Sequence, residues 1–284
     1  MSTGGGLHRA VERAVSVEAT ALQVFVKSSR QWVARALDPA AVAAFRETAT
    51  ECGLGPYTLA HASYLINLAS PDDALWERSA EAFGVELDRC RALGIPFLVV
   101  HPGSHVGSGE AAGLRRVARA LRGILGKRKG GGAGVTVLLE NTAGQGSNLG
   151  HRFEQLAWII EHCGVPSRIG VCFDTCHAFA AGYDFRDRRS YRAVVDEFDA
   201  TIGIERLRAF HLNDSQYGCG SRRDRHEHIG KGQLGLEGFR PIVNDPRFRD
   251  VPMVLETPKG EELTEDRSNL SALRSLVTKP GARR

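Results

Sequence analysis

Seven short apolar runs, separated by longer stretches of helical pattern, constrain the fold of this chain most strongly. The runs are Leu22–Lys27, Tyr57–Ala62, Phe97–His101, Val135–Glu140, Ile169–Asp174, Leu207–His211 and Pro252–Glu256. Near-continuous apolar strands that alternate with helices indicate a parallel sheet with helices on its outer face. The sequence therefore predicts an α/β fold of the (β/α)8 TIM-barrel type. Its 284 residues suffice, since such a barrel needs roughly 250 as one domain.

The N-terminal end of the chain departs from this barrel pattern. A closed barrel of this type needs eight strands, whereas the segment MSTGGGL leads directly into a helical pattern that includes Leu7, Ala10 and Val11. The first strand is therefore expected before Met1. Either the start was assigned too late or that strand is absent, and the two neighbouring strands would then have unpaired edges. No linker or composition break divides residues 1–284, so we expect one domain.

The helix expected between the second and third runs has recognisable end signals. Ser70 is expected to cap it, with Pro71 at the first helical position. Leu75 and Phe83 are expected on its buried face, and Gly94 lies where the helix should stop.

Side chains that can bind metal ions gather at the ends of the predicted strands. Five of the runs finish in such a residue: His101, Glu140, Asp174, His211 and Glu256. A sixth run carries His61 next to its last residue. A single histidine at a strand end is more often structural. The C-terminal ends of parallel barrel strands converge on one rim, however, so six such residues together predict a site there.

Further candidate ligands follow two of these ends. The segment DTCH places His177 three residues after Asp174, and Asp224 and His226 form an i, i+2 pair that points to one side in extended chain. The resulting nine nitrogen and oxygen ligands suit zinc, with manganese or iron as substitutes. Nine ligands exceed the needs of one ion. They indicate a cluster of two or three ions, which suits phosphate chemistry.

Composition excludes some classes of protein and leaves others open. No apolar run is long enough to span a bilayer and no signal peptide is visible, so an intracellular soluble protein is the default. The net charge of +4 permits an anionic partner without arguing for one. The six cysteines form no CxxC pair and are expected to be reduced. Cys176 is the best thiol candidate for chemistry, yet a packing role is favoured for it.

These motifs together resemble those of the endonuclease IV family of apurinic/apyrimidinic endonucleases. The matching segments are HASYLINL (61–68), HPGSH (101–105), ENTAGQGSNLG (140–150), DTCHAFAAGYD (174–184), HLND (211–214), GSRRDRH (220–226) and LET (255–257). They are long, occur in the family's order and, with the first run, spread over residues 22–257. Only the N-terminal strand of the family pattern is missing.

The resemblance implies three zinc ions on the barrel rim. The first ion would be held by His61, His101 and Glu140, the second by Glu140, Asp174, His211 and Glu256, and the third by His177, Asp224 and His226. Glu140 would bridge the first two ions, and a metal-bound hydroxide would be the nucleophile. The third ion would stabilise the departing 3′-oxygen.

The resemblance also implies an activity of the deoxyribonuclease IV type. The phosphodiester 5′ to an abasic site in double-stranded DNA would be hydrolysed, leaving a 3′-hydroxyl and a 5′-deoxyribose phosphate for base-excision repair. Removal of 3′ blocking groups is a related family activity. A monomeric, cytoplasmic enzyme of bacterial type, associated with the nucleoid when acting, is expected.

Four residues are predicted to contact DNA. Arg30 and Tyr64 resemble family residues that enter the base stack beside the lesion, although a surface arginine and a rim-packing tyrosine are the plain alternatives. Arg222 and Arg225 flank the third-ion ligands and suit phosphate contact, against a solvated loop. The basic stretch 127–129 precedes a strand, so it is expected as a solvated loop on the opposite face.

Two rival functions remain open at this point. A single-metal sugar isomerase or epimerase on the same barrel would need only Glu140, Asp174, His211 and Glu256. The five further ligands argue against it. A non-catalytic DNA-binding protein with a degenerate site is disfavoured by the intact ligand set, and an inactive product of a misplaced start is the remaining reading.

Overall fold

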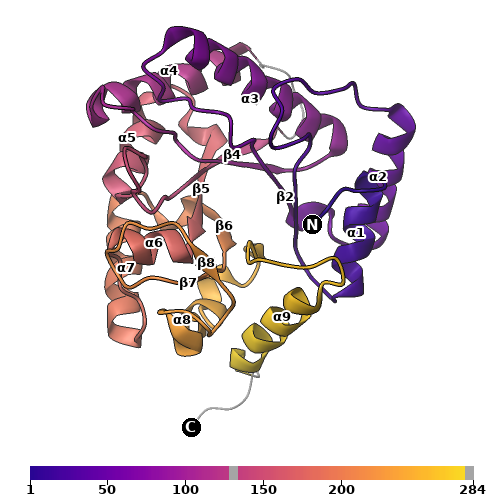
Figure 1. Cartoon of the computed structure of the whole chain (residues 1–284), viewed down its shortest axis with the longest axis vertical. Helices are drawn as coiled ribbons and strands as arrows, with labels where there is room; N and C mark the ends of the chain where they lie inside the picture. Colours follow the sequence, from indigo (N-terminus) through magenta and orange to yellow (C-terminus); the bar gives the residue numbers. More distant parts are fainter. Residues whose placement is uncertain (128–133, 279–284) are drawn as a thin grey trace.

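Strands and helices alternate along the chain and form a nearly closed parallel barrel (Figure 1). The computed structural model describes residues 1–127 and 134–278, so most of the basic stretch 127–129 lies outside the described residues. The sheet has seven parallel strands: β1 (Leu22–Val24), β2 (Thr58–His61), β3 (Phe97–Val100), β4 (Thr136–Glu140), β5 (Ile169–Asp174), β6 (Leu207–His211) and β9 (Met253–Val254). Every predicted strand is present; β5 and β6 have the predicted bounds, and the other five are shorter than expected, β1 and β9 by the most.

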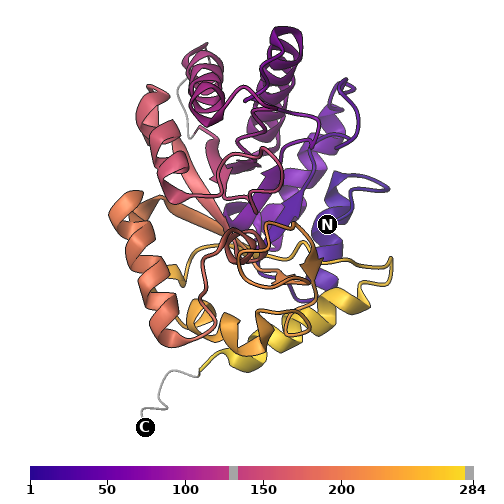
Figure 2. The same cartoon turned by 60° about the vertical axis from the view of Figure 1, so that its left-hand side comes forward.

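The helices lie outside the strands, as Figure 2 shows. Those found in the described residues are α1 (Leu7–Ser16), α2 (Pro39–Glu51), α3 (Asp73–Leu93), α4 (Glu110–Lys127), α5 (Phe153–His162), α6 (Thr175–Ala181), α7 (Arg188–Thr201), α8 (Gly235–Val243) and α9 (Thr264–Leu276). Alternate residues of each strand belong to two different apolar layers, since successive side chains point to opposite faces of the sheet. Leu98 belongs to the layer under the helices, whereas Val99 belongs to the barrel interior. Within the described ranges, no helix combines the length and apolarity needed to cross a membrane.

Helix α3 begins two residues later than predicted. Asp72 is the N-cap, because its carboxylate accepts the N–H of Leu75 at 2.7 Å. Ser70 instead accepts the N–H of Asp72 at 3.2 Å, and Pro71 precedes the helix. The prediction for Leu75 was also wrong, since it is 36% exposed. Gly94 ends the helix with φ 72°, as predicted, because glycine tolerates the left-handed region.

The barrel has a seam between β1 and β9, the two ends of the strand order. Residues that the structure describes provide no strand pairing there. The Gln23 side chain bridges the seam instead, and the first residue of the chain contacts β1 there. The Gln23 side chain donates to Glu256 Oε1 at 2.5 Å, and the Met1 ammonium group donates to the Gln23 carbonyl oxygen at 2.5 Å.

Outside this seam, helix α9 approaches the end of α1, although the two helices come from opposite ends of the chain (Figure 1). Arg274 of α9 pairs with Glu18 at 3.0 Å, and Arg267 donates to the Ser16 carbonyl oxygen at 3.3 Å. These contacts of α9 thus connect the two ends of the chain beside the seam, where the strands do not pair.

Candidate metal centre

Six of the nine predicted ligands come from the C-terminal ends of strands of the barrel. His61, Glu140, Asp174 and His211 end β2, β4, β5 and β6, whereas His101 and Glu256 lie just beyond β3 and β9. Because parallel strands end on the same rim, these side chains meet there. Together with His177 and His226 they form three groups, and within each group the ligand atoms lie within 4.8 Å of one another.

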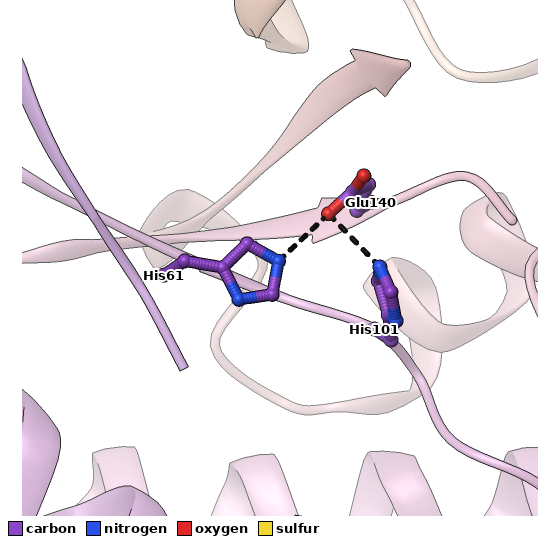
Figure 3. Close-up of side chains that lie close together, drawn as sticks. All are labelled: His61, His101 and Glu140. Carbon is purple, nitrogen blue, oxygen red and sulfur yellow. Dashed lines mark hydrogen bonds and ion pairs between the residues drawn. The ribbon is translucent and has the colours of Figure 1, made fainter. Parts of the chain in front are cut away.

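The first group contains His61, His101 and Glu140 (Figure 3). Glu140 Oε2 lies 3.1 Å from His61 Nε2 and 3.2 Å from His101 Nε2. His61 Nδ1 is 2.7 Å from the Ala62 carbonyl oxygen and therefore carries the proton in neutral imidazole. The Nε2 lone pair then faces the carboxylate, as a metal ligand requires.

The second group contains Glu140, Asp174, His211 and Glu256. His211 Nδ1 lies 3.0 Å from Glu140 Oε1 and 3.3 Å from Glu256 Oε2. Asp174 Oδ2 is 3.8 Å from the same nitrogen. Glu140, Asp174 and His211 are fully buried, whereas the Glu256 side chain is 18% exposed.

The third group contains Asp174, His177 and His226, with Asp224 in contact. Helix α6 starts directly after β5, and the Asp174 side chain caps it by accepting the His177 N–H at 2.7 Å. Asp224 Oδ1 lies 3.2 Å from His177 Nε2 and 3.5 Å from His226 Nε2. An antiparallel pair of strands, β7 (Asp214–Ser215) and β8 (His226–Glu227), delivers His226. This pair was not predicted.

Neighbouring groups orient these ligands. His177 Nδ1 is 3.0 Å from the Asn141 carbonyl oxygen, and His226 Nδ1 is 3.2 Å from the Glu256 carbonyl oxygen, so both Nε2 atoms face the site. The Asn213 side chain donates to Asp174 Oδ2 at 2.7 Å. Asn141 and Asn213 thus help to orient His177 and Asp174.

The carboxylates and imidazoles of the three ligand groups shift one another's pKa values and together favour the binding of cations. Burial alone would raise the pKa of Glu140, but His211 and His101 hold that pKa well below the ordinary value. Burial alone would lower the pKa of His177, but Asp174 and Asp224 raise it well above the ordinary value. Buried carboxylates beside imidazoles form an N/O donor set that fits divalent cations of the zinc type. The residues present therefore fit a metal centre.

The four residues predicted to contact DNA lie in loops at this rim or near it. Tyr64 is 63% exposed, and its ring centroid lies 5.5 Å from that of His61. Arg225 is exposed and donates to the Asp224 carbonyl oxygen at 2.6 Å. Arg222 is exposed and has φ 53°, while its N–H donates to the Ala180 carbonyl oxygen at 2.8 Å. Arg30 is exposed in the loop after β1.

Sequence reasoning missed Gln23 in β1. Its side chain contacts both His211 and Glu256 of the second group. The available signal was a polar residue between Leu22 and Val24 in a strand that reads as apolar. Glutamine is not a usual zinc ligand, so its residue type alone does not mark Gln23 as part of a metal site.

Comparisons with known proteins agree with this architecture. A family model described as "Xylose isomerase-like TIM barrel" matches residues 11–276. The "Probable endonuclease 4" of Chloroflexus aurantiacus is 52% identical over 277 residues, covering 98% of this chain and 96% of the relative. The crystal structure of endonuclease IV from Thermus thermophilus is 40% identical, with a TM-score of 0.84, over 97% of this chain and 96% of that one. A D-tagatose 3-epimerase-like protein has a TM-score of 0.71 at 17% identity, over 96% and 93% of the two chains, and shares the fold alone.

Proposed function

Since this chain belongs to the endonuclease IV family, we propose that it is an apurinic/apyrimidinic endonuclease of the deoxyribonuclease IV type. It hydrolyses the phosphodiester bond 5′ to an abasic site in double-stranded DNA. The products are a 3′-hydroxyl and a 5′-deoxyribose phosphate, which places the reaction in base-excision repair. Removal of 3′ blocking groups uses the same site, because it also breaks the bond between a phosphorus atom and a 3′ oxygen.

One observation carries this proposal: the three ligand groups are contiguous. Glu140 belongs to the first and second groups, and Asp174 belongs to the second and third. Adjacent cation sites can neutralise both the attacking and the leaving oxygen of a phosphate, which a single ion cannot do as well. A cluster of this kind suits phosphodiester hydrolysis.

Three divalent ions, which we take to be zinc, would be held by nine residues. These are His61, His101, Glu140, Asp174, His177, His211, Asp224, His226 and Glu256. When bound, the ions supply Lewis-acid stabilisation of phosphate oxygens and activate water. The chain itself supplies two buried carboxylates, Glu140 and Asp174, each of which belongs to two ligand groups. Manganese and iron accept similar donors and could replace zinc.

The rim residues bind and orient the DNA. We propose that Tyr64 and Arg30 enter the base stack beside the lesion, where a missing base lowers the cost of unstacking. The Tyr64 ring packs against Phe25 at a centroid distance of 5.5 Å and projects beside the first group. Arg222 and Arg225 contact phosphates and position the duplex without reading its sequence.

The rival function, a single-metal sugar isomerase or epimerase, uses the second group alone. Fold likeness does not separate the two functions, because the epimerase-like protein has the same barrel. The first and third groups are superfluous in an isomerase. We therefore favour the nuclease.

The organisation of the protein is a further part of the proposal. One apolar layer runs from Ala10 in α1 to Leu276 in α9, which supports a single domain over residues 1–284. We expect a monomer that works in the cytoplasm, at the nucleoid when bound to DNA.

The test uses a labelled duplex with one tetrahydrofuran abasic analogue, and zinc is quantified on the same protein sample. The analogue cannot undergo β-elimination, so a cut on its 5′ side must be hydrolytic. We expect cleavage with about three zinc ions per chain, as in a two- or three-ion phosphate site. Glu140→Gln should abolish cleavage, and Glu161→Gln, at an exposed position in α5, should retain it. A folded, zinc-loaded protein that leaves the duplex intact would overturn the proposal and favour the isomerase.

A further inference from the structure

Gln23 occupies a position that neighbouring strands fill with apolar side chains. In the register of β1 and β2 it pairs with Leu59, which belongs to the apolar interior of the barrel. Gln23 is half-buried, and placing a carboxamide among such neighbours is costly unless both of its polar ends are hydrogen-bonded. The contacts of Gln23 therefore indicate why the chain has an amide there.

Both ends of the Gln23 amide contact predicted metal ligands. Its Nε2 donates to Glu256 Oε1 at 2.5 Å, and its Oε1 lies 2.8 Å from His211 Nε2. Only the NH₂ end can donate to a carboxylate, so the hydrogen-bond network assigns the amide orientation. The carbonyl end can only accept, and His211 Nε2 must therefore carry a hydrogen.

This assignment leaves the correct atoms free for an ion. With its hydrogen on Nε2, neutral His211 presents the lone pair of Nδ1. That nitrogen faces Glu140 Oε1 at 3.0 Å and Glu256 Oε2 at 3.3 Å. The amide contacts Glu256 Oε1 and leaves Oε2 to face the second group.

His61, His177 and His226 achieve the same result with main-chain groups. The non-coordinating nitrogen of each lies within 3.2 Å of a carbonyl oxygen. His211 instead relies on a side chain, which reaches it from β1. Gln23 also contacts Glu256 just beyond β9, at the seam where the described residues have no strand pairing. Its side chain is thus the link that sets the distance between the two edges at this ligand pair.

We propose that Gln23 is a positioning residue of the second metal site. It holds the ring and tautomer of His211, turns Glu256 so that one carboxylate oxygen faces the ion, and fixes both across the β1–β9 seam. The inference rests on the proposed metal-dependent function. It adds a residue that binds no ion itself but determines how two ligands are presented.

The test compares Gln23→Met, which keeps the length of the side chain, with Gln23→Glu and the wild type. The matched control is Gln233→Met, at an exposed position. Zinc retained per chain is measured against increasing chelator. Loss of a residue that orients a ligand typically weakens metal affinity by about 10- to 100-fold. We expect one zinc ion of Gln23→Met to be bound about 10- to 100-fold more weakly than in the wild type. Gln233→Met should bind all of its ions as the wild type does.

A second readout separates positioning from general structural damage. In the zinc-loaded protein, ¹⁵N NMR should show a protected His211 Nε2–H. Gln23→Met should lose that protection because the acceptor is gone, whereas Gln23→Glu should keep it because a carboxylate also accepts. If Gln23→Met does not fold, Gln23→Ala takes its place, with the same expected loss.

The outcomes distinguish this inference from the proposed function. Wild-type zinc affinity and a protected Nε2–H in Gln23→Met or Gln23→Ala would overturn the positioning role, whether or not the wild type cuts DNA. A wild type that fails to cut abasic DNA, yet shows zinc binding that depends on Gln23, would sink the nuclease proposal and leave the positioning role standing.

Discussion

Lys27 and Glu86 form an ion pair inside the protein, with Nζ 3.2 Å from Oε1 and side chains 4% and 1% exposed. The pair lies under both loops proposed to meet the DNA stack. Lys27 donates to the Gln31 carbonyl oxygen at 2.6 Å in the loop after β1, and Glu86 accepts the Ser63 N–H at 3.1 Å in the loop after β2. One buried pair therefore fixes the relative placement of these two loops.

Replacing Lys27 should destabilise the protein in a pH-dependent manner. Lys27→Met leaves a buried carboxylate without its partner, which typically costs about 3–5 kcal/mol near neutral pH. Burial raises the pKa of Glu86 above its ordinary value of 4.5, and Lys27 opposes that shift. Stability linked to a raised carboxyl pKa is present at lower pH and is lost as pH rises through the folded-state pKa. Without Lys27 the pKa of Glu86 rises further, so the deficit of the variant should grow as pH rises from the ordinary carboxyl pKa of 4.5 towards neutral pH.

Urea unfolding across this pH range measures the effect of the substitution. The control is Arg9→Gln, which breaks the Arg9–Glu12 pair, whose side chains are 55% and 45% exposed. Exposed pairs contribute about 0.2–1 kcal/mol. If Lys27→Met costs no more than this control, or costs the same at every pH, the buried pair does not have the assigned role.

Asp214 should hold the segment that follows β8, the strand that carries His226 of the third ligand group. Its carboxylate accepts N–H groups of Ser215, Gly230, Gly232 and Leu234 at 2.8 to 3.0 Å. Asp214→Ala leaves these donors without an acceptor, and each buried loss costs about 1–3 kcal/mol. We expect lower stability, faster trypsin cleavage within residues 221–226 and about one zinc ion fewer per chain. Asp250→Ala, at an exposed position, should show none of these effects.

Gly232→Ala should displace the Asp214 carboxylate without changing Asp214 itself. A Cβ at this position would lie 2.4 Å from Asp214 Oδ1 and 2.4 Å from the Ser215 carbonyl oxygen. The loop must shift, so zinc content and melting temperature should fall as in Asp214→Ala. Gly218→Ala is the matched control, because nothing lies within 4 Å of its added Cβ. Equal behaviour of the two glycine variants would contradict this account of the loop.

Removal of metal ions should lower the melting temperature. Ligands that bind only the folded state stabilise it by mass action, by about 2.7 kcal/mol for an ion at a hundred times its Kd. Treatment with EDTA should therefore lower the melting temperature, and added zinc should restore it. His101→Ala should weaken this response, whereas His162→Ala, on the exposed end of α5, should keep it in full. A melting temperature that changes with neither EDTA nor zinc would argue against a metal centre.

Tyr64→Ala should weaken DNA binding without changing the metal content. Stacking of an aromatic ring against a base contributes about 1–3 kcal/mol, so we expect about tenfold weaker binding of the tetrahydrofuran duplex. Fluorescence anisotropy in the Glu140→Gln background avoids cleavage during the measurement. Tyr57 is 36% exposed and precedes β2, at the opposite end of that strand, so Tyr57→Ala should bind normally. Equal affinities of the two variants would remove Tyr64 from the DNA interface.

The sequence predicted the parts of the fold and site that depend on local pattern. β5 and β6 have the predicted bounds, and their last residues, Asp174 and His211, meet in one ligand group because strand direction alone brings such ends together. The error at α3 was also local. Ser70 and Asp72 can both cap, and the carboxylate reaches the Leu75 N–H.

Contacts between distant segments could not be predicted in this way. Gln23 and Glu256 are 233 residues apart, and they touch only because the barrel curls until β1 approaches β9. The pairing of Lys27 with Glu86 likewise depends on how α3 packs against the sheet. Neither partner identifies the other in sequence, since many surface residues have the same charges.

The placement of all nine predicted ligands at the C-terminal ends of strands or beyond leaves the other end of the barrel free for attachment. The short 3₁₀ helix η3 (Ile204–Arg206) precedes β6, and Glu205 in it is exposed. The five residues of β6 separate it from His211 by about 16 Å of extended chain. A fluorophore or a surface tether at Glu205 would thus hold the protein with its ligand-bearing rim outward, as single-molecule observation on DNA requires.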